Sequence, residues 1–232
     1  KYVFPKTVEG CGGDGSIERM PGQSAYRCVV MDSEALFKRK LYHFVSKKCF
    51  NIDGFGPKQI DLFLEYGLIQ EYADIFTLKK GDIEILPRMG EKSADNIISA
   101  IEKAKHVQLW RFIFSLSIPA VGEETARDLA RLCGGDIRVL QHMKVEDLEG
   151  VDGIGEVVAQ NIYAWFRDVK HMHTLDSVLK VISIVSESAI SKKSGSQVFA
   201  GKTFVLTGTL PTLSRDEAGE MVRVHGGEVS SS

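Results

Sequence analysis

Apolar positions in the central part of the chain recur in register. Four short stretches each end in an apolar residue followed by glycine, at intervals of 34, 32 and 33 residues; these glycines are Gly56, Gly90, Gly122 and Gly155. The fourth residue after each glycine is small or apolar and the seventh is large and apolar; the two sets are Ile60, Ala94, Ala126 and Ala159, then Phe63, Ile97, Leu129 and Ile162. Residues three and four apart share one helical face. This period predicts a helix, a tight hairpin and a second helix, used four times.

The hairpins have the features of an anion-binding turn. We call them hairpin 1 (residues 52–56), hairpin 2 (86–90), hairpin 3 (118–122) and hairpin 4 (151–155). Glycine in a tight turn can take positive φ and admits a ligand close to the backbone. The next helix offers unpaired N–H groups and the positive end of its dipole, which suit a phosphate. One such turn could equally be a plain connection, but four copies favour binding. The expected site residues are Gly54, Gly56, Lys58, Gly90, Lys92, Gly122, Gly153 and Gly155.

Other patterns predict a small β-hairpin before the repeats and an α/β segment after them. Residues 16–28 suit two strands around a type II turn at Pro21-Gly22, and residues 33–48 suit an amphipathic helix. A strand is expected at 202–210, then a helix from Ser214 with a capping box. We therefore predict a mainly α chain with four parts: a β-hairpin knuckle at 1–32, a helical domain at 33–182, a linker at 183–199 and a partial α/β domain at 200–232.

Composition narrows the class of protein. Of 232 residues, 44% are hydrophobic and 26% charged, as in an ordinary soluble globular protein, and no run of about 18 apolar residues would cross a membrane. We expect a piece of a longer protein, because the chain starts at Lys1 and stops within an α/β pattern. The four cysteines lack framework spacing and no signal peptide is present, which favours the cytoplasm. Cys49 and Cys133 suit small buried apolar positions.

Charge limits how the chain could hold nucleic acid. Residues 1–49 carry nine lysines and arginines against five acids, whereas residues 50–182 carry 15 against 21. An acidic repeat region excludes a broad basic field, so binding would rest on backbone amides and placed cations, with Lys58, Lys92, Arg111 and Arg127 as candidates. The basic face of the helix at 33–48 could be a solvated face or a phosphate contact; its residues are Lys38, Arg39, Lys40, Lys47 and Lys48.

The stretches 53–58, 88–96 and 121–126 resemble the helix-hairpin-helix motifs of bacterial NAD-dependent DNA ligases. The knuckle resembles the zinc finger of that family, and residues 200–232 resemble the start of its BRCT domain. The resemblance implies that the chain binds the backbone of duplex DNA across the minor groove, and that this DNA is nicked. It also implies a parent enzyme that seals nicks in replication and repair with NAD and Mg, and with catalytic domains upstream of this chain. No Lys-x-Asp-Gly motif or nucleotide loop occurs here, so we expect no catalytic residue, no cofactor and no ligase activity in this chain alone.

The zinc ligands of that family are half missing. The resemblance places cysteines at positions 8, 11, 28 and 33, but only Cys11 and Cys28 remain, beside Val8 and Ser33. Structural zinc needs four ligands, and His43 falls in a helix where a structural role is the simpler interpretation. We therefore expect no metal site.

Two other functions stay open. One is a non-catalytic helix-hairpin-helix DNA-binding or scaffold module of another repair protein, against which the knuckle and the BRCT-like start argue. The other is a helical interaction domain that never meets nucleic acid, which the acidic balance of the repeats favours.

Overall fold

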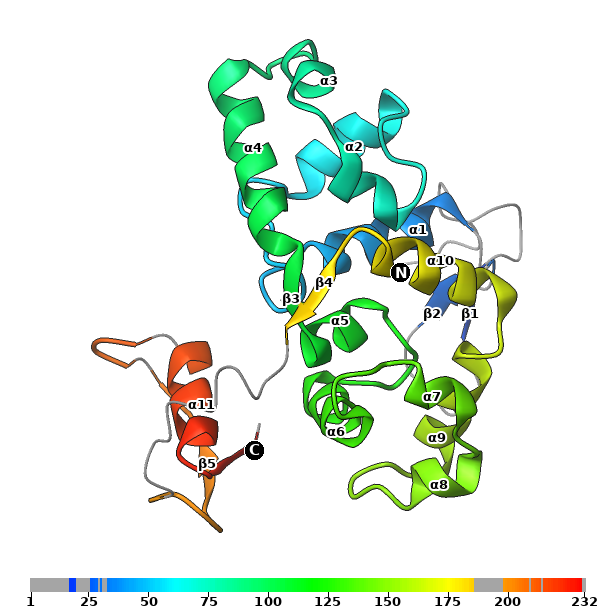
Figure 1. Cartoon of the computed structure of the whole chain (residues 1–232), viewed down its shortest axis with the longest axis vertical. Helices are drawn as coiled ribbons and strands as arrows, with labels where there is room; N and C mark the ends of the chain where they lie inside the picture. Colours follow the sequence, from blue (N-terminus) through cyan, green and yellow to red (C-terminus); the bar gives the residue numbers. More distant parts are fainter. Residues whose placement is uncertain are drawn as a thin grey trace, which may run out of the picture. The chain divides into compact units, whose positions relative to one another are not determined.

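The computed structural model describes residues 17–19, 26–28, 30, 33–185, 198–208, 210–213 and 215–230 (Figure 1). The chain forms two compact units, residues 1–185 and 186–232. Most described residues are helical, so the predicted mainly α class is confirmed. No helix in these ranges is long and apolar enough to cross a membrane.

The first unit is built from short helices and two pairs of short strands. Its helices are α1 (Glu34–Phe44), α2 (Pro57–Glu65), the 3-10 helix η1 (Tyr72–Thr77), α3 (Lys80–Glu84), α4 (Glu91–Ala104), α5 (Leu109–Ser115), α6 (Glu123–Cys133), α7 (Val139–His142), α8 (Val145–Glu149), α9 (Glu156–Trp165) and α10 (Val169–Leu179). Its strands are β1 (Ile17–Arg19), β2 (Tyr26–Cys28), β3 (His106–Gln108) and β4 (Ser183–Val185).

The predicted fourfold unit is present. The helices on either side of each hairpin pack together, which gives the pairs α1–α2, α3–α4, α5–α6 and α8–α9. In Figure 1, α3 and α4 lie at one end of this unit and α8 and α9 at the other. All eight core positions predicted from the repeat are at most 3% exposed. The period of the apolar residues therefore identified the buried face of each second helix correctly.

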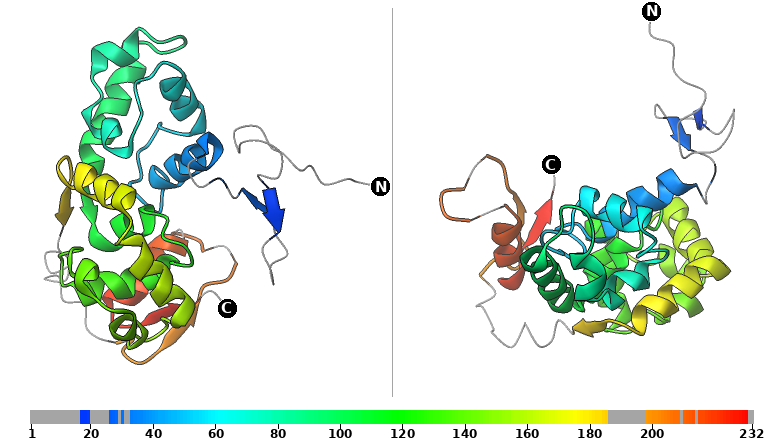
Figure 2. Two further views of the ribbon diagram at one scale, coloured as in Figure 1. Left: turned by 90° about the vertical axis from the view of Figure 1, so that its right-hand side faces the viewer. Right: turned by 90° about the horizontal axis from the view of Figure 1, so that it is seen from above.

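The C-terminal segments of the first unit, α10 and β4, pack against segments from its middle. Helix α10 packs against η1. Strand β4 pairs in parallel with β3, so that His106 lies opposite Ser183 (Figure 1; Figure 2 shows the same unit from two other sides). The prediction of a linker from residue 183 was wrong for residues 183–185. They form a strand because the Ser183 amide donates to the Lys105 carbonyl over 2.7 Å and Ile184 packs on the core.

The region around the knuckle partly matches its prediction. Strands β1 and β2 are antiparallel, with Ile17 opposite Cys28, whereas the Pro21-Gly22 turn, Val8 and Cys11 lie outside the described residues. The following helix is shorter than the predicted 33–48. It ends at Phe44 because the chain turns back, and the Phe50 amide donates to the Phe44 carbonyl.

Two arginines, Arg111 and Arg127, make contacts between helices of the first unit. The guanidinium of Arg127 is 3.5 Å from the centre of the Trp110 ring and hydrogen-bonds Glu123 over 3.2 Å. Glu123 also pairs with Lys48 over 2.9 Å, and Arg111 donates to the carbonyl of Lys47 over 2.8 Å. The prediction that Arg127 is a DNA-facing cation was therefore wrong, because Arg127 is only 8% exposed and is engaged inside the protein. Arg111 is only partly buried and lines a groove together with Lys103, so its role as a DNA-facing cation stays a prediction.

The second unit has a small core. It consists of β5 (Thr203–Val205), α11 (Arg215–Val224) and β6 (Glu228–Ser230), with β5 parallel to β6. The strand is shorter than the predicted 202–210, the helix ends at Val224 before the glycine pair as expected, and Ser214 lies outside the described residues. Val222 is buried, but Val205 and Met221 are each 50% exposed. Two strands and one helix leave much of the apolar surface uncovered.

This small core predicts weak protection of the second unit. We expect the amide of Val205 to exchange with solvent much faster than that of Ile97, which lies in the core of the first unit. Hydrogen–deuterium exchange of the whole chain measures both amides together. Equal protection at the two positions would show that the second unit is a stable domain by itself.

The ion pairs of Glu123 predict a dependence of stability on pH. Burial alone raises the pKa of Glu123, but the hydrogen bonds from Lys48 and Arg127 outweigh it and leave the pKa below its ordinary value. Such a carboxylate stabilises the fold above its unfolded-state pKa of about 4.3, and this contribution is lost as the pH falls through the lower native pKa. Glu123→Gln should therefore lower the free energy of unfolding at pH 7 by about 1–3 kcal/mol, and by much less at pH 3.

Urea denaturation at pH 7, 5 and 3 measures this difference. Glu156→Gln, at the equivalent first position of α9 and exposed, is the matched control with the same change of charge. If both variants had the same stability as each other at pH 7, the network around Arg127 would contribute nothing.

Candidate nucleic-acid interface

The four hairpins share one turn geometry. In each, the amide of the fourth residue donates to the carbonyl of the first, over 3.3, 3.1, 3.1 and 3.0 Å in hairpins 1 to 4. The third residue has positive φ, between 63° and 79°; these residues are Gly54, Arg88, Ala120 and Gly153. This combination defines a type II turn. Apolar residues at the first and fourth positions hold it, since Ile52, Phe55 and Ile154, among others, are buried.

The glycine that ends each hairpin does not have the backbone conformation that the sequence predicted. Positive φ was expected in the hairpin glycines, and Gly54 and Gly153 have it. Gly56, Gly90, Gly122 and Gly155 do not. They are the N-cap residues of α2, α4, α6 and α9, with φ from −128° to −86° and extended ψ, a conformation open to any residue. Their backbone conformation does not require glycine.

Packing within the chain does not require glycine at these positions either. A Cβ atom added to Gly90, Gly122 or Gly155 would meet no described atom within 4 Å, and one added to Gly56 would meet only the Gln59 side chain at 3.8 Å. Because glycine has no side chain, the space directly in front of the helix N-terminus stays free. A group from outside the chain can approach the backbone there.

Two helices of the unit begin with a side-chain cap, whereas α3, α5 and α7 begin without one, like the hairpin helices. The Ser33 hydroxyl caps α1 by accepting from the Leu36 amide, and the Asp168 carboxylate caps α10 by accepting from the amides of Lys170 and His171. The four hairpin helices have no side-chain cap. At Lys58, Lys92 and Val157 the second N–H group of the helix therefore stays available to an acceptor from outside. In contrast, Pro57 has no N–H, and the Gln59 and Val158 amides already donate to the Gly56 and Gly155 carbonyls.

Charge differs among the hairpins. The second residue after the final glycine is exposed Lys58 in hairpin 1 and exposed Lys92 in hairpin 2. The equivalent residues are Glu124 in hairpin 3 and Val157, 67% exposed, in hairpin 4. Hairpins 1 and 2 are therefore the more favourable sites for an anion.

The basic face of α1 is partly engaged within the protein. Lys38 lies 3.4 Å from Glu34 and 3.6 Å from Asp61, and Lys48 pairs with Glu123. These contacts favour the structural interpretation of this face for Lys38 and Lys48.

Of the two remaining knuckle cysteines, Cys28 is described by the structure and Cys11 lies outside the described residues. The Cys28 sulfur lies 3.3 Å from the Ser33 hydroxyl, so the position of the expected fourth ligand carries a helix cap instead. His43 is within 2.9 Å of the Phe114 carbonyl and points into the helical core. Burial raises the pKa of Cys49 and of Cys133 to about 12, which keeps both thiols protonated. The described residues contain no cluster of three metal-ligating side chains.

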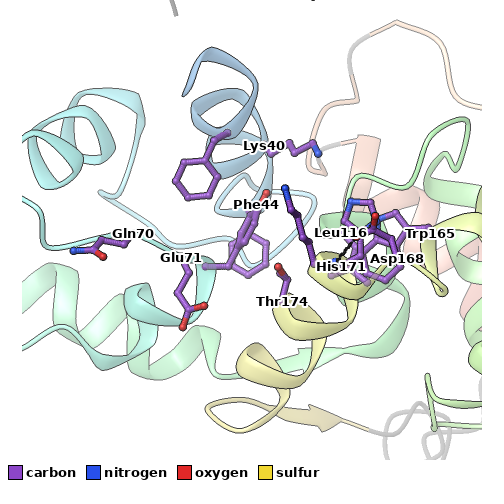
Figure 3. A pocket seen from close by; sticks show the side chains of 12 residues that line it. Lys40, Phe44, Gln70, Glu71, Leu116, Trp165, Asp168, His171 and Thr174 are labelled. Carbon is purple, nitrogen blue, oxygen red and sulfur yellow. Dashed lines mark hydrogen bonds and ion pairs between the residues drawn. The ribbon is translucent and has the colours of Figure 1, made fainter. Parts of the chain in front are cut away.

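A cavity of about 500 Å³ lies away from the hairpins, between α1, η1 and α10 (Figure 3). Gln70 and Glu71 line one end, and Trp165, Asp168 and His171 line the other. The His171 ring stacks on Trp165, and its Nδ1 lies 3.7 Å from Asp168, the residue that caps α10. These polar groups stabilise the start of α10, and none of the expected site residues lines the cavity.

Comparison with known proteins covers the whole chain. Residues 50–103 match the family described as SAM-like helix-hairpin-helix tandem, and residues 111–175 match the family described as helix-hairpin-helix motif. Among curated relatives, DNA ligase 1 of Opitutus terrae is 38% identical over 235 residues, which cover 99% of this chain and 34% of the relative. DNA ligase of Desulfosudis oleivorans is 36% identical over 232 residues, which cover 100% of this chain and 34% of the relative.

The chain thus spans about a third of the length of the curated relatives it matches. Both matched regions contain hairpins that open onto uncapped helix N-termini. The predicted resemblance to DNA ligases is confirmed along the full chain, which is similar to about a third of each of these relatives and itself matches two helix-hairpin-helix families.

Proposed function

We propose that this chain binds duplex DNA without sequence preference, as the DNA-gripping part of an NAD-dependent DNA ligase. The observation that carries the proposal is the set of four glycine N-caps, which neither backbone conformation nor packing requires and which leave open space before uncapped N–H groups. Phosphate oxygens are the natural acceptors for such groups. The contacting residues are Gly54, Gly56, Lys58, Gly90, Lys92, Gly122, Gly153 and Gly155.

Electrostatics sets the mode of binding. The excess of acids in residues 50–182 opposes general attraction to DNA, so binding depends on local contacts at the hairpins and weakens as salt rises. Contacts to phosphates position a protein on the duplex without reading bases. A nicked duplex is the expected partner, because the relatives are named DNA ligases.

The longer protein would carry the chemistry. In this proposal, a lysine elsewhere in it takes AMP from NAD, passes it to the 5′-phosphate of the nick, and the 3′-hydroxyl displaces AMP. NAD and Mg would act in that part of the longer protein, upstream of this chain, because this chain contains no Lys-x-Asp-Gly motif. This chain would hold the nick in place, and positioning supplies a large share of many rate enhancements. A cytoplasmic location, a role in replication and repair, and a BRCT domain beginning at about residue 200 belong to the same proposal.

The alternatives are less well supported. A scaffold module of another repair protein does not account for similarity to DNA ligases along the full chain. A helical interaction domain that does not bind nucleic acid does not explain why all four hairpins end in a glycine N-cap. DNA-binding measurements separate this last alternative from the proposal.

The hairpin glycines provide the direct test. Replacing Gly56 and Gly155 together by valine should weaken binding to a nicked duplex by about tenfold or more, because the added side chains would occupy the space of the phosphates and remove charge-assisted hydrogen bonds. Fluorescence anisotropy measures the affinity, and circular dichroism checks that helical content is kept.

Gly81→Val is the matched control. Gly81 lies in α3, away from the turn, and an added Cβ atom there also meets no described atom within 4 Å. Wild-type affinity in the Gly56→Val, Gly155→Val variant would show that the hairpins are only turns.

A second experiment addresses catalysis. Labelled NAD should leave no covalent AMP on this chain, and the chain added to a catalytic piece from one of the DNA ligase relatives should raise nick sealing without changing self-adenylation. The physical reason is that the chain positions the nick and does not activate it. A stable AMP adduct on any of its lysines would place the catalytic centre here instead.

A further inference from the structure

Helix α4 has two polar faces of different character beside its buried face. The buried face consists of Ala94, Ile97, Ile101 and Ala104. One polar face is acidic and partly neutralised: Lys80 pairs with Glu91 over 3.1 Å and with Asp95 over 2.8 Å, and Lys105 pairs with Glu102 over 2.6 Å. Two lysines thus oppose three carboxylates, which reduces the negative field of this face to one net charge.

The other polar face carries hydrogen-bond donors and no acid. It consists of Lys92, Asn96, Ser99 and Lys103, which we call the α4 stripe; steps of four, three and four residues keep them on one side of the helix. All four are exposed, and within the described parts of the chain none of these side chains has a recorded hydrogen bond or ion pair. Two ammonium groups, an amide and a hydroxyl thus face solvent together.

The α4 stripe connects two hairpins. It begins at Lys92, directly after hairpin 2, and α4 runs from there to β3 (Figure 1). Its other end lines a groove of about 830 Å³ whose opposite wall includes Asn51, Asp53 and Gly54, at hairpin 1. The eleven steps from Lys92 to Lys103 span about 16 Å at the helical rise of about 1.5 Å per residue. Measured along the axis of a duplex, this length corresponds to about five base pairs, at about 3.4 Å per phosphate of one strand.

We propose that the α4 stripe is a second contact surface for DNA, along which the phosphodiester backbone of one strand runs between hairpins 1 and 2. The inference rests on the proposed function and extends it to side chains outside the hairpins. Ammonium, amide and hydroxyl donors match phosphate oxygens, and the stripe offers no apolar anchor for a protein partner. Asp53 is the acid in the groove lining, where Lys103 and Arg111 oppose its charge.

A matched pair of variants tests the inference. Lys103→Gln removes a charge from the α4 stripe, whereas Lys105→Gln removes the same charge from the lysine paired with Glu102; glutamine suits a helix in both. We expect Lys103→Gln to weaken binding and to make the slope of log affinity against log salt shallower by about 0.9, as for one lost phosphate contact. Lys105→Gln should keep the wild-type slope, and Lys103→Arg should restore it.

The outcomes distinguish this inference from the proposed function. If Lys103→Gln has the slope and affinity of Lys105→Gln while the Gly56→Val, Gly155→Val variant loses binding, the α4 stripe does not contact DNA and the hairpin proposal stands. If the glycine variant also binds like wild type, the proposed function itself is wrong, and the inference fails with it.

Discussion

The structure depends on helices that begin without a side-chain cap. A serine, threonine, aspartate or asparagine at the N-cap accepts from first-turn N–H groups and stabilises a helix by about 1 kcal/mol relative to alanine. This chain uses such caps at α1 and α10, with Ser33 and Asp168. At all four hairpins it has glycine instead, in a conformation that any residue could adopt. The polar groups of the chain leave these N-termini open, which is the physical basis of the DNA-binding proposal.

The remainder of the first unit holds these open turns in place. Each hairpin is fixed by an internal hydrogen bond and by buried apolar residues on both sides of the positive-φ position. Arg127 over Trp110 links α6 to α5, Glu123 between Lys48 and Arg127 links α6 to the segment after α1, and the strand pair β3–β4 links the end of the unit to its middle. Because Arg127 is used in this framework, the proposed phosphate binding would depend on backbone amides and on a few exposed cations.

Local periodicity explains what could be predicted from the sequence. The face of each second helix follows from residue spacing, so all eight core positions were correct. Features that depend on distant neighbours could not be predicted in this way. The sequence predicted that Arg127 is a DNA-facing cation, but in the structure it lies over the Trp110 ring. The sequence also predicted a linker at residues 183–185, but these residues form a strand that pairs with β3. Spacing also could not locate positive φ, because Arg88 and Ala120 adopt it under the constraint of the turn. The spacing of the α4 stripe is visible in the sequence, but the ion pairs of its acidic neighbours and its position between hairpins are not.

The central claim is that N–H groups after the hairpin glycines hold phosphates, and an NMR titration of the isotope-labelled chain with a nicked duplex observes these groups directly. We predict that the amide signals of Lys58, Lys92, Glu124 and Val157 shift on binding and that the shifts diminish as salt rises. The amides of Leu36 and His171, which already donate to Ser33 and Asp168, serve as internal controls and should stay in place. Shifts confined to other surfaces, with the four hairpin amides unchanged at saturating DNA, would contradict the account.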